Sequence, residues 1–131
     1  MKDRVRQEII DLHEFFQAWF VGSAEQTDEA FSRVGRSLAE EFELVAPDGE
    51  VVPRRRIMSS IQRGFGRRPD FRIHIENFDA RVSEGGLCLV TYHEIQEQEE
   101  VTTRRVSSAV FRDAPEAPNG VRWLHVHETW V

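Results

Sequence analysis

The sequence predicts an α+β fold in which helices cover one face of a curved sheet. Up to about residue 65, apolar residues recur every three or four positions, which is the spacing of amphipathic helices. From about residue 71 they recur every second position, which is typical of strands with one buried face. Helices followed by strands indicate separate helical and sheet layers. The length of 131 residues fits one domain, expected to cover residues 1–131.

The N-terminal part of the chain predicts two helices. The first is expected over residues 3–21, because Val5, Ile9 and Leu12 begin an apolar stripe at helical spacing. Gly22 follows the last residue of that stripe and favours the end of a helix. A second, shorter helix is expected to start after Thr27, whose side chain is of a helix-capping type.

A small hairpin is expected to lead into a third helix. Strands are expected over residues 42–46 and 50–52, because Pro47-Asp48-Gly49 between them has the composition of a turn. Pro53 suits the first turn of a helix, where its missing N–H has no cost, and Gly64 is expected to end that helix.

Four long antiparallel strands are expected to complete the fold. They are predicted over residues 71–82, 87–99, 103–112 and 121–131, with glycine-rich or proline-rich loops at 83–86 and 113–120. Glu94 on one strand and Arg104 and Arg105 on the next are expected to form ion pairs across an exposed hairpin. The last strand holds two histidines, a glutamate and two tryptophans, and is therefore expected to be central to the fold.

Charge and composition limit the classes of partner and compartment. The net charge of −6 argues against general binding of nucleic acid, and no apolar stretch is long enough to cross a membrane. The only cysteine, Cys88, lies in an apolar run and excludes an internal disulfide. A cytoplasmic location is therefore expected. A basic cluster at residues 54–56 is expected to be a solvated helix face, with an anionic partner as the alternative.

The order of these elements resembles the nuclear transport factor 2-like superfamily, nearest to its SnoaL-like branch. Three stretches carry the resemblance: residues 42–49 after the first two helices, residues 51–61, and residues 104–128, which end in a strand with Trp123, two histidines and Glu128. The resemblance implies a cone-shaped, strongly curved antiparallel or mixed sheet wrapping three N-terminal helices. It also implies a pocket inside the cone and dimers formed through the outer face of the sheet.

A pocket inside the cone is predicted from the alternation of the last strand. Glu128 and Trp130 are expected to point inward, while Tyr92 is expected to face outward. The resemblance places further residues inward on the neighbouring strands and over the pocket from the helical part of the chain. The predicted pocket therefore consists of Phe16, Trp19, Phe65, Thr91, His93, Ser108, Glu128 and Trp130. A carboxylate among aromatic rings has a raised pKa, so Glu128 with His93 is the predicted catalytic pair.

The outer face of the last strand predicts a dimer interface, because aromatic residues are enriched in interfaces. Its expected members are Phe111, Trp123, His125 and His127. We expect a homodimer that binds a small organic molecule and needs no cofactor or metal. Two alternatives remain: an isomerase, lyase or hydrolase using Glu128 and His93, or a non-catalytic association module. A metal site at His125 and His127 is disfavoured, because no metal-binding motif supplies further ligands.

Overall fold

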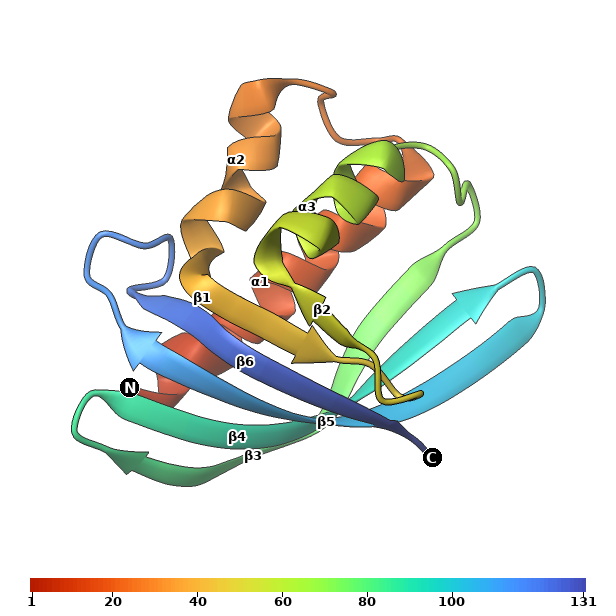
Figure 1. Ribbon diagram of the computed structural model, residues 1–131. Helices are drawn as coiled ribbons and strands as arrows, with labels where there is room; N and C mark the ends of the chain where they lie inside the picture. The colour runs from red at the N-terminus through yellow and green to blue at the C-terminus, as the bar shows by residue number, and fades with distance from the viewer.

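A computed structural model describes all residues, 1–131, and shows three helices packed on the concave face of a bent six-stranded sheet (Figure 1). This arrangement confirms the predicted α+β fold. The elements follow one another as α1 (Lys2–Val21), α2 (Asp28–Ser37), β1 (Leu38–Val45), β2 (Val51–Pro53), α3 (Arg54–Arg63), β3 (Arg72–Glu84), β4 (Leu87–Gln98), β5 (Val101–Asp113) and β6 (Val121–Trp130).

The sheet places the C-terminal strand in its interior. The strand order is β2-β1-β6-β5-β4-β3. β6 pairs in parallel with β1 and antiparallel with β5, and the remaining pairs are antiparallel, so the sheet is mixed. Residues of β6 that face the helices therefore lie near the centre of the concave face of the sheet.

Helix α1 fills the concave side of the sheet through the predicted apolar stripe. Val5 and Ile9 are fully buried, and Leu12 is nearly so. The helix ends at Gly22, which adopts a left-handed conformation with φ of 87° and donates its N–H to the carbonyls of Ala18 and Trp19. None of the three helices has the length and apolar character that spanning a membrane requires.

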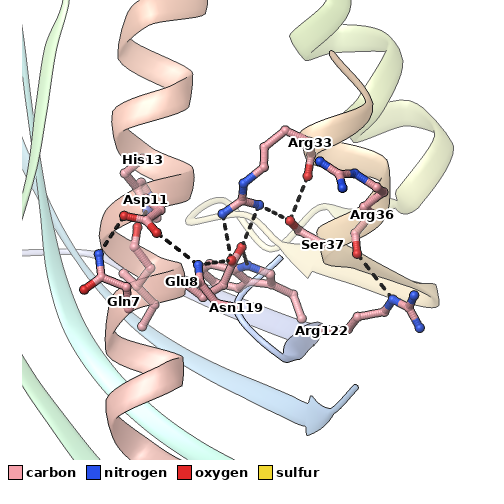
Figure 2. A network of polar contacts seen from close by, with 11 residues as sticks. Gln7, Glu8, Asp11, His13, Arg33, Arg36, Ser37, Asn119 and Arg122 are labelled. Carbon is pink, nitrogen blue, oxygen red and sulfur yellow. Dashed lines mark hydrogen bonds and ion pairs between the residues drawn. The ribbon is translucent and has the colours of Figure 1, made fainter. Parts of the chain in front are cut away.

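A buried carboxylate ties α1 to α2 and to β6. The Glu8 side chain is fully buried and accepts hydrogen bonds from both terminal nitrogens of Arg33, at 2.8 and 3.2 Å. It also accepts from Asn119 Nδ2 at 2.9 Å and from Trp123 Nε1 at 3.0 Å. Figure 2 shows Arg33 and Asn119 converging on Glu8 from two separate parts of the chain. This network fixes α1, and with it the residues that α1 presents to the sheet.

The inward face of β4 differs from the prediction. Cys88, Val90, Tyr92 and Glu94 are buried, so this parity faces the helices. The predicted inward position of His93 is wrong, and so is the predicted outward position of Tyr92. Both parities of this strand carry apolar residues, so alternation alone does not distinguish its two faces.

A β-bulge reverses the alternation of β6. Phe111 pairs with Trp123 and Val110 pairs with His125, so Leu124 is an extra residue without a partner. Trp123 and Val126, three positions apart, are consequently both buried against the helices. The predicted dimer interface is wrong for Phe111 and Trp123, which are 0% and 3% exposed in the core. The other two predicted members, His125 and His127, are half-buried and exposed, respectively, on the outer face.

Candidate functional site

A cavity of about 340 Å³ lies between α1, α3 and the concave face of the sheet. Small-molecule sites have volumes of roughly 300–1,000 Å³, so the space suits a compact ligand. Most of its wall is apolar or aromatic: Leu12, Phe16, Phe20, Leu38, Phe42, Leu44, Ile57, Ile61, Phe71, Ile73, Tyr92, Trp123 and Val126. The polar lining residues are His13, Ser60, Arg68, Glu94, Gln96, Arg105 and Glu128.

Four charged side chains form what we call the charged floor: His13, Glu94, Arg105 and Glu128. His13 Nε2 lies 3.1 Å from Glu94 Oε1, and Arg105 Nη1 lies 3.2 Å from Glu128 Oε1. Arg105 Nε, 3.9 Å from Glu94 Oε2, joins the two ion pairs. That nitrogen is buried and has no hydrogen-bond partner within the protein.

Strand pairing brings the charged floor together. Glu94 on β4 lies directly opposite Arg105 on β5, and Glu128 on β6 lies opposite Ser107, two residues further along β5. All three charged side chains therefore project from one face of adjacent strands, and α1 brings His13 down onto that face. Gln96 Nε2 donates to Glu94 Oε2 at 2.6 Å and fixes the carboxylate from the same strand.

The surroundings of His13 indicate that it is an imidazolium. Its Nδ1 lies 2.7 Å from the Ile9 carbonyl and its Nε2 faces the Glu94 carboxylate, so each ring nitrogen faces an acceptor, which favours the doubly protonated ring. Burial lowers the pKa of His13, but the hydrogen bond and charge of Glu94 outweigh it and the pKa is raised. Burial raises the pKa of Glu94, but the bond and charge of His13 leave it lowered.

Glu128 is the acidic group with hydrogen-bonding capacity left over. Burial raises its pKa, the Glu94 charge raises it further, and Arg105 opposes both, so the pKa of Glu128 is above its usual value. Its Oε1 accepts from Arg105, while its second oxygen accepts no hydrogen bond from the protein. Tyr92 beside it stays a phenol, because burial and the two carboxylates raise its pKa well above 10.0. The floor therefore offers an acceptor with a raised pKa to whatever enters the cavity.

Of the predicted pocket residues, Phe16 and Glu128 line the cavity and six do not. Trp19 is buried behind it, where its Nε1 donates to the Ile61 carbonyl at 2.8 Å, and Phe65 packs edge-on against Trp19. Trp130 projects beyond the cavity at the end of β6 and is 54% exposed. Its ring stacks under the Arg105 guanidinium, with 4.6 Å between the guanidinium carbon and the ring centre.

The other three predicted pocket residues lie on the outer face of the sheet. Thr91 accepts a hydrogen bond from Arg81, Ser108 is exposed, and His93 Nδ1 lies 3.0 Å from Arg104 Nη1. His93 is therefore separated from Glu128 by the sheet, and the predicted pair of the two residues is wrong. The histidine inside the cavity is His13. No group of three His, Cys, Asp or Glu side chains is placed to hold a metal ion.

Sequence reasoning missed His13, Glu94 and Arg105. The signal for His13 was a polar side chain immediately after Leu12 in the apolar stripe of α1. Glu94 and Arg105 were expected to pair across an exposed hairpin. They do lie opposite each other, but Glu94 is 5% exposed, because the pair sits under α1 rather than at the hairpin tip.

Comparison with known proteins assigns the chain to a family. Residues 5–131 match the family model described as sucrose-6-phosphate phosphohydrolase C-terminal. The chain belongs to this family. Probable sucrose-phosphatase 3a of Arabidopsis thaliana is 24% identical over 129 residues. The match covers 95% of the chain but 29% of that relative, so the chain spans less than a third of the plant protein's length.

Solved structures confirm the resemblance to the nuclear transport factor 2-like superfamily. A protein of that fold and of unknown function from Pseudomonas aeruginosa has a TM-score of 0.87 and 26% identity, with 98% of each chain covered. The calcium/calmodulin-dependent kinase II hub of S. rosetta has a TM-score of 0.66 at 14% identity, covering 98% of this chain and 95% of the hub. At that level of identity, the hub shows the shared fold alone.

Proposed function

We propose that this member of the family binds a small organic molecule in the cavity between α1, α3 and the sheet. The observation that carries the proposal is a charged floor beneath a mostly aromatic wall. Burying four charges costs free energy, and apolar residues would fill the space at no such cost. Apolar walls with a few convergent polar groups and residues of shifted pKa are typical of binding sites. The phosphatase activity named for the plant relative is not carried over, since the chain matches only 29% of that protein.

The neutral fluorophore N-phenyl-1-naphthylamine provides the test. We expect it to bind at one molecule per chain with enhanced emission, because its two aromatic groups can pack against the rings of the cavity wall. Ser60 lines the cavity from α3 and is exposed. Ser60→Trp should place an indole in the opening of the cavity, where it displaces part of the probe from the apolar wall. The apolar contact that the probe loses should weaken its binding by about tenfold or more.

Ser59→Trp is the matched control, because Ser59 is the adjacent residue of α3, is exposed and does not line the cavity. Fluorescence titration of wild type and both variants measures the dissociation constants. Equal affinities for the two variants, or no binding by the wild-type protein, would refute a binding site in this cavity.

A second candidate function is acid–base catalysis by Glu128. The specific observation in its favour is the raised pKa of a carboxyl group whose second oxygen is free to meet a ligand. A base of this kind removes protons more effectively than an exposed carboxylate does, and isomerases, lyases and hydrolases all use such a step. His13 is not the base in this scheme, because both its ring nitrogens face acceptors within the protein; it orients Glu94 instead.

The model substrate 5-nitrobenzisoxazole tests this candidate without knowledge of the natural ligand. A base takes its ring C–H proton, the N–O bond breaks, and the coloured cyanophenolate forms. We expect the wild-type protein to accelerate the reaction by about a hundredfold over Glu128→Gln, with a rate that rises as pH passes through the raised pKa of Glu128. Glu97→Gln, a change on β4 outside the cavity lining, should have no effect. Equal rates for wild type and Glu128→Gln would exclude Glu128 as a base.

Self-association through the outer face of the sheet stays a prediction. With Phe111 and Trp123 in the core, the face that would pair consists of His125, His127 and the outward residues of β4 and β5. The association-module alternative depends on this same face and likewise stays a prediction.

A further inference from the structure

Arg68 is an unpaired cation in the cavity lining. It lies in the segment between α3 and β3, is partly buried, and forms no ion pair and no side-chain hydrogen bond. Its guanidinium carbon is 5.2 Å from the ring centre of Phe20 and 5.1 Å from that of Phe71. Both rings also line the cavity. Arg105, the other arginine in the cavity lining, forms an ion pair with Glu128. Its charge is therefore compensated within the protein, whereas that of Arg68 is not.

The position of Arg68 is fixed before any ligand binds. Its backbone N–H donates to the Phe20 carbonyl at 2.9 Å, and its own carbonyl accepts from the Phe71 N–H at 3.1 Å. Two aromatic rings contact the planar guanidinium, which limits its orientation. The N–H donors that remain have no acceptor in the protein, so an acidic group on a ligand could take two of them at once.

Among the charged residues that line the cavity, Arg68 carries the one positive charge that no carboxylate compensates. His13 is balanced by Glu94, and Arg105 is balanced by Glu128. No carboxylate lies within ion-pairing distance of Arg68. An organic anion would compensate this charge, whereas an organic cation would be repelled by it.

We propose that the ligand is an amphipathic organic anion, with its acidic group on Arg68 and its apolar body along the aromatic wall toward Glu128. The inference rests on the proposed binding function and narrows it to a ligand class. The partial exposure of Arg68 places the acidic group near solvent, while the apolar body replaces water against Phe16, Phe20 and Phe71. At the other end, the ligand presents a hydrogen-bond donor to the free oxygen of Glu128.

Two matched probes test the acidic group. 8-Anilinonaphthalene-1-sulfonate and N-phenyl-1-naphthylamine share their ring system, and only the first carries an anion. We expect Arg68→Gln to weaken binding of the sulfonate by about tenfold, the loss of one charge-assisted interaction, and to leave the neutral probe within about twofold. Arg68→Lys should restore part of the sulfonate affinity. Arg67→Gln, at an exposed neighbouring arginine outside the lining, should change neither probe.

The outcomes separate this inference from the binding function. If the neutral probe binds the wild-type protein but Arg68→Gln leaves sulfonate affinity unchanged, the anion inference is overturned and the binding function stands. If neither probe binds the wild-type protein, both are overturned. Displacement of the sulfonate by 1-naphthoate or by 1-naphthyl phosphate supports the inference, and the stronger competitor tells a carboxylate ligand from a phosphate ester. Unfolding midpoints that match the wild-type value exclude misfolding of the variants.

Discussion

Replacement of Glu8 by Ala is expected to lower the free energy of unfolding by about 3–5 kcal/mol, the usual cost of removing one partner of a buried ion pair. The reason is the number of donors that one carboxylate satisfies. Arg33 donates from both terminal nitrogens and Asn119 adds one hydrogen bond (Figure 2). Trp123 Nε1 adds another. Without Glu8, the Trp123 N–H and the inward part of Arg33 remain buried without acceptors.

Urea denaturation followed by circular dichroism measures this loss. Glu14→Ala is the matched control, because Glu14 lies on the same helix and is exposed; its effect should stay within about 0.5 kcal/mol. A loss below about 1 kcal/mol for Glu8→Ala would contradict the role assigned to the network. Trp123 lines the cavity, so Glu8→Ala should also weaken binding of N-phenyl-1-naphthylamine.

His13→Gln is expected to lower the free energy of unfolding by about 3 kcal/mol in weakly acidic solution, and by less at lower or higher pH. The pKa of His13 is raised above 6.5, so the folded state holds this proton more tightly and the stabilisation is complete below pH 6.5. It is lost as pH rises through the raised value. The pKa of Glu94 is lowered below 4.5, so its contribution is present above pH 4.5 and lost as pH falls through the lowered value.

The difference in unfolding free energy between wild type and His13→Gln should therefore be greatest between about pH 4.5 and 6.5. Denaturation series from pH 4 to 9 measure it. Arg105, Glu128 and Tyr92 also face this pair, but they are present in both proteins and largely cancel in the difference. His127→Gln, an exposed change on the outer face of the sheet, is the matched control for the substitution itself. A flat profile for His13→Gln would show that no buried ion pair forms.

Much of the fold could be predicted because its signals are local. The apolar stripe of Val5, Ile9 and Leu12 indicates a helix without reference to the rest of the chain. The glycines and prolines of the turns likewise mark where the strands end. Glu128 was also predicted to point inward. The inward position of Glu128 is correct, although the bulge at Leu124 interrupts the alternation from which it was predicted. The bulge lies earlier on β6, so Val126 and Glu128 still share one face.

The composition of the site could not be predicted because it depends on long-range pairing. His13 and Glu94 are separated by 81 residues, and only the packing of α1 on β4 brings them into contact. The bulge at Leu124 has no glycine or other sequence signal, so uninterrupted alternation assigned Trp123 to the wrong face. On β4, apolar residues on both parities left the choice of face to the tertiary structure, and His93 was preferred to Glu94.

The central claim is that the space between α1, α3 and the sheet is the binding site. Nuclear magnetic resonance titration of the ¹⁵N-labelled protein with N-phenyl-1-naphthylamine tests it most directly. We expect the largest amide shifts at residues of the cavity wall, such as Phe16, Ile61 and Val126. Shifts confined to the outer face, at residues such as His93 and Ser108, would contradict the claim.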